Sequence, residues 1–508
     1  MKEKKTATTR TNAAVKNIKT AFAGIFVNLF LSFYSRNVFV KILGSEYVGL
    51  SSLFGNILVM LSFLEFGVGG AGIYLLYKPI AKHDNEKISD ILAFCRKSNY
   101  ISGCLVTAVG ISLLPVLEKI TGGLPDIPHI RTIYVLYIMS SGASYLFSYR
   151  KLLLFSDQKN YINENFAYVA GIISVIFETA ALYITKNYIL YLAICVFSQV
   201  TEDAILHVSV KKMYPEIDFS IRRKVPEKTK REVQKQARML VVQKIGTAAL
   251  SSVDNFIVVY YFGLSGNGIY SNYGMLLGTA SMLSIRIIGA VSGSVGNLGA
   301  SEDEKKARKV FRAVELACFF LTSVCTVMIA VLSQDFMKLW IGEENTLPKS
   351  ASFVVALLFY VMGMRESVLI FRDAYGLYYK EKIKPILEVV VTAAAAYVFA
   401  KKMGIAGIFF GRFVSCAAVC MWYEPYVLYK YGFHSKTSEY YKRAAMYFFL
   451  TASSCIVALF LCGFVRMYIL KIIICLCIPS VIFVLFFGYT PEVKYIRLAI
   501  RGMRKKGN

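Results

Sequence analysis

The stretch from Gly44 to Lys87 decides the fold of this chain: GSEYVGLSSLFGNILVMLSFLEFGVGGAGIYLLYKPIAKHDNEK. A turn at Gly44 opens a long apolar run, which carries a single acid, Glu65, in its middle. A patch of small residues follows, made of Gly67, Gly69, Gly70, Ala71 and Gly72. The run is long enough to cross a hydrocarbon core of ~30 Å as a helix, and small residues let a second helix approach closely. The stretch therefore predicts a packed membrane-spanning helix.

The same plan returns later in the chain. Gly263–Gly268 opens a second apolar run, which carries Arg286 and ends at Ser301–Lys306. The offset is 219 residues (263 − 44) and holds without a gap. The matched pairs are Gly49 with Gly268, Ser52 with Ser271, Gly70 with Gly289, Ala81 with Ala300, Asp84 with Asp303 and Lys87 with Lys306. Because the loop ends align as well as the helices, we predict a duplicated membrane bundle, the usual build of a secondary transporter.

The composition supports a polytopic helical membrane protein. The 508 residues are 56% hydrophobic with a mean hydropathy of +0.52, whereas soluble chains are about 45–50% apolar. The net charge of +26 comes from Lys and Arg clustered between apolar runs, which the positive-inside rule explains better than nucleic-acid binding does. We expect no nucleic-acid partner.

The apolar runs predict an all-α protein with about fourteen spans, arranged as two pseudo-symmetric lobes of six helices and a C-terminal helix pair. The expected spans are 17–41, 47–77, 88–117, 130–155, 163–185, 188–212, 240–262, 269–298, 310–332, 350–379, 383–401, 404–429, 440–465 and 467–489. The expected parts are a basic tail (1–15), an N-lobe (16–213), a basic linker (214–238), a C-lobe (239–430), the helix pair (431–490) and a basic tail (491–508).

An even number of spans places both termini on one side of the membrane. Lys and Arg are enriched in the linker 214–238, the tails and alternate loops, and the positive-inside rule makes these cytoplasmic. The second part of the linker has two interpretations. It is either an amphipathic helix on the anionic inner leaflet or a segment whose charge only sets topology.

Charged side chains inside apolar runs mark where function should be sought, because each Arg or Lys at mid-helix costs about 2.5–3.5 kcal/mol on insertion scales. Several uncompensated ones would exceed a typical stability of about 5–15 kcal/mol. They must therefore face a wet cavity, a partner or an anionic ligand. The basic candidates for substrate binding are Arg36, Lys244, Arg286, Arg365 and Arg412, and the acidic candidates for ion coupling are Glu65, Glu178, Asp203 and Asp254.

Some of these candidates have a purely structural alternative. Arg36 and Lys244 lie near span ends and can snorkel to the interface, and Arg365 can pair with the acid that follows it. Glu65 and Arg286 are the leading functional candidates because they occupy nearly equivalent repeat positions (65 + 219 = 284). They either offer an acid and a base to a shared interface or form a salt bridge that holds a closed state.

No signature of catalysis or metal binding occurs in the sequence. There is no Walker A loop for ATP and no G-x-S-x-G elbow. The four His are scattered, and the eleven Cys lie in or near apolar runs without zinc or redox spacing. We expect no enzymatic activity, no catalytic residue, no cofactor and no metal.

Four runs together resemble the Wzx-type polysaccharide flippases of the multidrug/oligosaccharidyl-lipid/polysaccharide (MOP) superfamily. They are RNVFVKILGSEYVGLSSLF from Arg36, LSFLEFGVGGAGIYLLYKP from Leu61, GIYSNY from Gly268 and FRDAYGLYYKEKIKP from Phe371. The resemblance covers about the first 430 residues and implies a MATE-like fold with two six-helix lobes around a central cavity. The last two spans depart from the twelve-span pattern and resemble the extra pair of the lipid II flippase, which is implicated in holding a lipid tail.

The resemblance implies a function and a location. The substrate would be an undecaprenyl-pyrophosphate-linked oligosaccharide repeat unit, turned from the inner to the outer leaflet of the bacterial plasma membrane for O-antigen, capsule or exopolysaccharide assembly. A pyrophosphate needs Arg or Lys in a dry cavity. The implied partners are the lipid bilayer, H⁺ or Na⁺ as a coupling ion, and the polysaccharide polymerase and glycosyltransferases. Two alternatives stay open: a MATE-like cation-coupled drug or metabolite antiporter, and a non-transporting scaffold of the polysaccharide machinery.

Overall fold

The computed structural model of the chain describes residue 24 and residues 27–65, 67–115, 127–220, 223–299, 304–381 and 383–498. Helices make up nearly all of these ranges, and no strand occurs within them. The all-α prediction is confirmed. The predicted tail 1–15 lies outside the described residues, as does the part of the tail 491–508 that follows residue 498.

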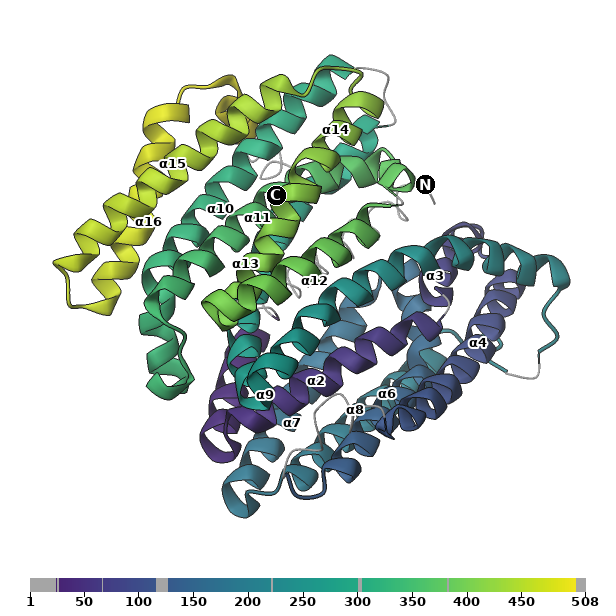
Figure 1. Cartoon of the computed structure of the whole chain (residues 1–508). Helices are drawn as coiled ribbons and strands as arrows, with labels where there is room; N and C mark the ends of the chain where they lie inside the picture. The colour runs from purple at the N-terminus through teal and green to yellow at the C-terminus, as the bar shows by residue number, and fades with distance from the viewer. Residues whose placement is uncertain are drawn as a thin grey trace. The chain divides into compact units, whose positions relative to one another are not determined.

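The chain forms two compact units, Met1–Gly268 and Ile269–Asn508. Unit 1 holds the helical residues 27–43 and the helices labelled in Figure 1 as α2 (Ser45–Leu61), α3 (Val68–Lys82), α4 (Asn85–Ser112), α6 (Ile130–Ser156), α7 (Asn160–Thr185) and α8 (Tyr188–Met213). The helix α9 (Glu227–Gly299) kinks at Gly263, where φ is +65°, and the boundary between the units falls just after this kink. It lies beyond the predicted linker because the first part of α9 packs against α2.

Unit 2 holds the rest of α9 and seven further labelled helices (Figure 1). They are α10 (Glu304–Ile341), α11 (Lys349–Ala374), α12 (Lys384–Met403), α13 (Ile405–Ser415), α14 (Met421–Tyr431), α15 (Ser438–Gly463) and α16 (Tyr468–Phe487). The last two, drawn in yellow, lie beside α10. Short segments of 3₁₀-helix precede the starts of α11 and α12, at Glu343–Asn345 and Leu377–Glu381.

The helices follow the predicted spans closely. Eight described segments are long and apolar enough to cross a membrane: Ser45–Glu65, Asn160–Thr185, Tyr188–Met213, Glu304–Ile341, Lys349–Ala374, Ile405–Tyr431, Ser438–Gly463 and Tyr468–Phe487. The other predicted spans coincide with the helical residues 27–43, with α4, α6 and α12, and with the two parts of α9. The chain is a multi-pass helical membrane protein.

The second predicted span differs from the expectation, because it is broken in the middle. The helix α2 tightens into a 3₁₀ turn at Ser62–Glu65, and α3 begins after Gly67, whose φ of +67° is left-handed. Glycine adopts this conformation without the steric cost that a Cβ brings. The hydroxyl of Ser102 donates to the Leu64 carbonyl across 3.0 Å, which satisfies one group that the break exposes. Glu65 therefore lies at a helix break, not inside a continuous helix.

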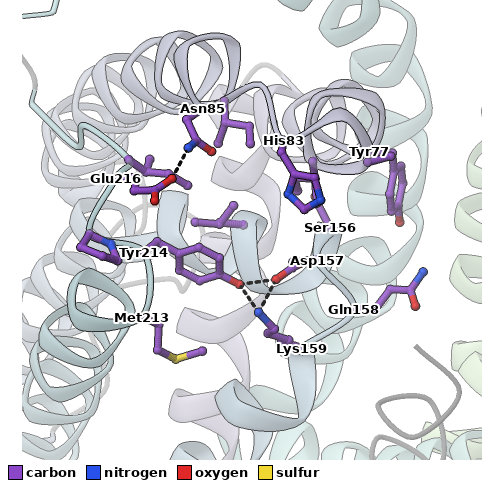
Figure 2. Close-up of a pocket in the computed structure, with 16 residues that line it drawn as sticks. Tyr77, His83, Asn85, Ser156, Asp157, Gln158, Lys159, Met213, Tyr214 and Glu216 are labelled. Carbon is purple, nitrogen blue, oxygen red and sulfur yellow. Dashed lines mark hydrogen bonds and ion pairs between the residues drawn. The ribbon is translucent and has the colours of Figure 1, made fainter. Parts of the chain in front are cut away.

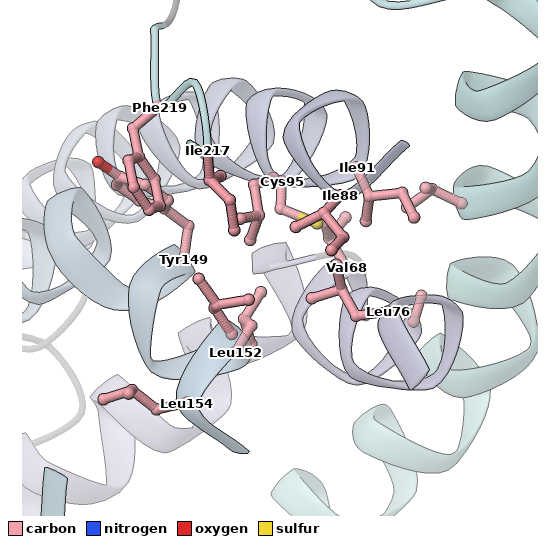
Figure 3. Close-up of a cluster of buried hydrophobic side chains, with 14 of the residues drawn as sticks. Val68, Leu76, Ile88, Ile91, Cys95, Tyr149, Leu152, Leu154, Ile217 and Phe219 are labelled. Carbon is pink, nitrogen blue, oxygen red and sulfur yellow. The ribbon is translucent and has the colours of Figure 1, made fainter. Parts of the chain in front are cut away.

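The predicted linker 214–238 packs on unit 1. Ile217 and Phe219 are buried with Tyr149 and Leu152 in one apolar cluster (Figure 3). Further along, Val233 and Ala237 of α9 join the same cluster, and these buried positions share one helical face. The apolar side of this segment is thus occupied by the protein itself rather than by lipid.

An ion pair fastens the linker at its centre. Arg223 donates from Nε to Asp90 across 2.7 Å, and a second carboxylate, that of Asp218, lies 3.6 Å from its guanidinium. The hydrogen bond to Asp90 is the main cause that raises the pKa of Arg223. The backbone N–H of Asp218 donates to the Ser89 hydroxyl across 3.0 Å. These contacts tie the linker to the second turn of α4.

Candidate functional site

Two glycines allow α2 and α9 to cross in close contact. A Cβ on Gly49 would lie 1.8 Å from the carbonyl oxygen of Leu264, and a Cβ on Gly268 would lie 2.0 Å from that of Ser45. Any side chain at either position would force the backbones apart. The Asn267 side chain donates to the Gly49 carbonyl across 2.8 Å, so the crossing also carries a polar contact.

Further polar contacts join α2 and α9 along the helices, beyond this crossing. Ser52 donates to the Asn255 side chain across 3.0 Å, and Ser252 donates to the Asn56 carbonyl across 3.1 Å. Asp254, one of the predicted coupling acids, lies between these α9 residues and is fully buried. Buried acids in a membrane helix cost free energy unless they serve a partner or a function. Asp254 is therefore held at a polar, tightly packed seam.

Arg36 lies in a group of tyrosines within unit 1. Tyr137, Tyr188 and Tyr191 are all within electrostatic reach of its guanidinium. The Tyr137 hydroxyl contacts that of Tyr188 at 2.8 Å and donates to Ser51 at 2.8 Å. Hydroxyl groups near a cation can stabilise it in a low-dielectric setting. Arg36 thus lies near these tyrosines, and both of its roles, as a substrate contact and as a snorkelling residue, stay predictions.

The remaining acids of unit 1 already have polar neighbours. Asp203 is buried and pairs with Lys151 at 2.9 Å. Glu178 is buried and accepts a hydrogen bond from Ser174, one helical turn earlier. Glu65 lies against Gly69, where an added Cβ would come 2.6 Å from its Oε1. Each of these acids stays a predicted coupling site with a different local setting.

The densest group of buried charges lies in unit 2, around Arg365 of α11. Arg365 donates to both oxygens of Glu424, across 3.0 Å from Nε and 2.7 Å from Nη2. Glu388 lies 3.5 Å from the same guanidinium, and Lys384 also pairs with Glu424. A bidentate Arg–carboxylate pair is the strongest form of this contact. We call these four residues the ion cluster.

Three further charged residues, near the end of α11, contact the ion cluster or one another. Glu381 is buried, pairs with Arg372 at 2.8 Å and lies 3.6 Å from Lys384. Arg372 in turn contacts Asp373 at 2.7 Å. Within the ion cluster, the two cations face two carboxylates, so its formal charges balance. Arg365 is therefore paired with carboxylates of its own unit, and among the described residues no ion pair joins it to Glu366, the acid that follows it in sequence.

Local backbone features make room for the ion cluster. The helix between α13 and α14 widens into a π turn at Cys416–Cys420, and Arg365 contacts the Cys416 sulfur at 3.3 Å. Gly407 and Gly411 let α13 approach α12 so closely that a Cβ on either would meet backbone atoms within 2.4 Å. Such π turns inside α-helices recur at functional sites. Glycine at these positions thus brings the acid-bearing helices α12 and α14 next to Arg365.

Sequence reasoning missed two members of the ion cluster. Glu424 is a lone acid in an apolar run directly before Pro425, and Lys384, at the start of the predicted span 383–401, was not a candidate although it begins α12 and is buried. The sequence did show Glu424 as an acid inside the apolar run 405–431. It did not show the partner of Glu424, because that partner, Arg365, is on α11 and far away in sequence.

The other basic candidates have separate settings. Arg286 is exposed on α9, and no ion pair to it occurs among the described residues. Arg412 is half-buried on α13, one turn before Cys416. Lys244 lies in α9, and its side chain is outside the described residues. Arg36 and Lys244 belong to unit 1, and Arg286, Arg365 and Arg412 belong to unit 2.

Unit 1 also holds a cavity of about 640 Å³ at the ends of α3, α6 and α8 (Figure 2). Tyr214 donates to Asp157 across 2.5 Å, and Lys159 lies 2.7 Å from the same carboxylate. Burial and this hydrogen bond raise the pKa of Tyr214. Across the cavity, Asn85 donates to Glu216 at 2.5 Å. The polar groups drawn with dashed lines bind one another, so the cavity is a polar, internally satisfied pocket.

Neither a protein-family model nor a curated protein sequence matches the chain. Solved structures do match. One is the lipid II flippase MurJ in an inward closed conformation, with 15% identity, a TM-score of 0.67, and 93% of this chain and 99% of that chain covered. Another is an inward-facing multidrug resistance MATE transporter of the MOP superfamily, with 12% identity, a TM-score of 0.64, and 77% and 92% covered.

A third match is a MOP superfamily transporter from Pyrococcus furiosus, for which reverse polarity of the binding pocket suggests a different function. It has 11% identity and a TM-score of 0.57, and the match covers 81% of this chain and 93% of that one. Identities this low establish the fold alone. The chain has the fold of the MOP superfamily transporters, which confirms the fold predicted from the sequence.

Proposed function

We propose that the chain is a flippase for an undecaprenyl-pyrophosphate-linked oligosaccharide repeat unit. It would turn this lipid from the inner to the outer leaflet of the bacterial plasma membrane for cell-surface polysaccharide assembly. Both termini lie in the cytoplasm in this proposal, as the basic tails and linker favour. The polymerase and glycosyltransferases of that assembly are its expected partners.

The C-terminal helix pair carries the proposal. The MurJ structure matches 93% of this chain, whereas the MATE structures match 77% to 87% of it. A fold that extends beyond the MATE core favours a lipid substrate, because a long polyprenyl tail needs an apolar surface that a small soluble drug does not. The helix α16 offers such a surface, with outward-facing Ile469, Leu470, Ile473, Leu476 and Leu485.

This helix pair is firmly docked within unit 2. Arg443 of α15 donates to Glu315 of α10 across 2.9 Å, and Glu315 is fully buried. The rings of Phe319 and Tyr447 stack with centroids 4.3 Å apart. At the other end, Lys471 of α16 lies 2.7 Å from an α10 carboxylate. A tail-binding surface built on these contacts would stay in a fixed position on α10.

Arg286 is the basic residue that we propose to contact the pyrophosphate, because its side chain is exposed on α9. Arg365 faces carboxylates instead, so in this proposal it holds α11, α12 and α14 together. Arg36, Arg412 and Lys244 remain predicted substrate contacts, and Glu65, Asp254, Glu178 and Asp203 remain predicted sites for H⁺ or Na⁺. The membrane potential, negative inside, favours outward movement of an anion by about 2.3 kcal/mol per charge per 100 mV.

The test is transport in proteoliposomes. Purified chain would be reconstituted with a fluorescent undecaprenyl-pyrophosphate oligosaccharide, and flipping would be followed by quenching of the outer leaflet, with and without an imposed potential. Protein-dependent flipping, faster when the potential favours anion movement, is the expected result. Transport of organic cations without lipid flipping would support the MATE-like antiporter instead, and failure to move either would favour the scaffold alternative.

A further inference from the structure

A hollow of about 610 Å³ lies between the end of α14 and the start of α15. It is lined by Tyr426 and by the side chains of Lys430, His434, Ser435, Lys436, Thr437 and Ser438. The lining residues include two lysines, one histidine and four side chains with hydroxyl groups, those of Tyr426, Ser435, Thr437 and Ser438. No acidic residue lines this hollow. The chemistry of the lining thus suits an anion.

The ammonium groups of the two lysines, Lys430 and Lys436, are not paired with a carboxylate among the described residues. The Lys430 ammonium donates to the Tyr426 hydroxyl across 2.6 Å and lies 5.0 Å from the centre of that ring. Lys436 is exposed. Among the described residues, neither lysine forms an ion pair. A tyrosine holds Lys430 in place without cancelling its charge.

The nearby carboxylates are engaged elsewhere. Glu304, at the start of α10, lies 2.9 Å from His434 Nδ1. Glu439, in the first turn of α15, pairs with Arg312 at 2.5 Å. These acids therefore offset His434 and an α10 arginine, and the charge of the two lysines remains available to a ligand.

Hydrogen-bond donors complete the hollow. The Ser435 hydroxyl oxygen is buried and has no hydrogen-bond partner among the described residues. Thr437 caps α15, a helix of 26 residues, without a side-chain bond to its first amides. The first N–H groups of a helix have no partner within it, and they favour a negative charge. Because the Ser435 hydroxyl is enclosed, the hydroxyl donors open to a ligand in the hollow are those of the half-buried Thr437 and the exposed Ser438.

The setting places this hollow at the level of lipid headgroups. Tyr431, the last residue of α14, and Tyr441, in the first turn of α15, are exposed on the two helix ends that form the hollow, and exposed Trp and Tyr gather where a membrane meets water. The hollow follows the last turn of α14 and precedes the first turn of α15, both of which are candidate spans. A ligand there would sit beside the bilayer surface.

We propose that this hollow binds a phosphate group, with Lys430 and Lys436 matching its charge and the hydroxyls of Thr437 and Ser438 and the first amides of α15 donating to its oxygens. The phosphate can belong to an anionic lipid headgroup or be free in solution. The proposal does not depend on the flippase activity, because a structural lipid would bind in the same way.

The experiment measures lipid binding through Trp422, which lies one helical turn from Tyr426. The chain has two tryptophans, so a Trp340→Phe background leaves Trp422 as the single reporter. Detergent-solubilised protein would be titrated with brominated phosphatidylglycerol or phosphatidylcholine, which quench tryptophan on contact. The variant is Lys430→Gln/Lys436→Gln, with Lys436→Gln alone as a milder change.

Lys401 and Lys402 offer a matched control. Lys401 donates to Tyr397 across 3.4 Å and lies 4.6 Å from that ring, the same lysine–tyrosine arrangement without the hollow. Each basic residue near a membrane surface contributes enough affinity that we expect Lys430→Gln/Lys436→Gln to weaken phosphatidylglycerol binding about tenfold or more. We expect Lys401→Gln/Lys402→Gln to leave it unchanged, with equal melting temperatures for both variants.

Competition with inorganic phosphate identifies the source of the ligand. Displacement of phosphatidylglycerol by millimolar phosphate would mean that the hollow takes the phosphate group from either source. No displacement, with a tenfold preference for phosphatidylglycerol over phosphatidylcholine, would mean that it takes the anionic lipid. The proposal is overturned if folded Lys430→Gln/Lys436→Gln binds phosphatidylglycerol like the unmodified chain, or if the two lipids bind equally.

Discussion

Gly49 and Gly268 occupy equivalent positions of the sequence repeat and touch at the crossing of α2 and α9. The contact is reciprocal: Gly49 abuts the carbonyl oxygen of Leu264, and Gly268 abuts that of Ser45. Ser45 and Leu264 are themselves separated by the repeat offset of 219 residues (264 − 45). Two equivalent segments that cross about a local two-fold axis make contacts of this kind. The reciprocity supports the duplication inferred from the sequence.

The first prediction concerns this crossing. Gly49→Ala and Gly268→Ala each place a methyl group within about 2 Å of a backbone oxygen, so each should destabilise the fold by about 1–3 kcal/mol. Gly55→Ala is the matched control on α2, because a Cβ there would meet nothing within 4 Å. Unfolding by denaturant in detergent measures the effect. Equal stability of Gly49→Ala and Gly55→Ala would argue against a close crossing.

The second prediction concerns the ion cluster. Removing one partner of a buried pair costs about 3–5 kcal/mol because the other charge is left unmatched, so Arg365→Gln and Glu424→Gln should each be strongly destabilising. The double variant should be less destabilised than the sum, by about 1–3 kcal/mol. Unfolding free energies of all four proteins form the cycle that measures this coupling.

An exposed pair of the same unit is the control for that cycle. Arg312 and Glu439 are in contact, but their side chains are 41% and 66% exposed, and such pairs couple by less than about 1 kcal/mol. If the Arg365–Glu424 cycle gave a coupling no larger than this one, the ion cluster would not hold α11 and α14 together.

Glu424 shows most clearly what could and could not be predicted from the sequence alone. Spans of about 20 apolar residues predicted the helices well, because hydrophobic length is a local property. The partner of Glu424 is 59 positions away in the sequence, and no local pattern encodes which helix faces which. The ion cluster was therefore predicted only in part, through Arg365.

The break in the second predicted span is a backbone feature that could not be predicted from the sequence either. Hydropathy does not distinguish a continuous helix from α2, a 3₁₀ turn and α3, since the residues on both sides of the break are apolar or small and Glu65 is the only charged residue near it. The Gly67 conformation was available as a possibility, because glycine is the residue that adopts positive φ readily. Its neighbours Gly69 and Gly70 have the same permissiveness but lie within helix α3, so composition alone did not locate the break.

The third prediction concerns the docking of the C-terminal helix pair. Arg443→Gln removes the partner of the fully buried Glu315, and we expect a loss of about 2–3 kcal/mol in the docking of α15. That loss should raise hydrogen exchange in the first turns of α15 by about thirtyfold or more.

The ion pair at the opposite end provides the control for this measurement. Lys471 and Asp335 are in contact at 2.7 Å, but their side chains are 21% and 43% exposed. Lys471→Gln should therefore raise exchange in α16 by less than about fivefold. Similar effects of Lys471→Gln and Arg443→Gln would contradict a dominant anchor at Glu315.

The fourth prediction tests the central claim, that an exposed cation on α9 helps to carry an anionic lipid across the membrane. The measurement is the initial rate of lipid-linked oligosaccharide flipping in proteoliposomes for Arg286→Ala, Arg286→Lys and the control Arg466→Ala, an exposed arginine in the loop between α15 and α16. We predict a loss of about tenfold or more for Arg286→Ala, partial recovery for Arg286→Lys, and an unchanged rate for Arg466→Ala, with equal melting temperatures. Flipping by folded Arg286→Ala at the rate of the unmodified chain would contradict the claim.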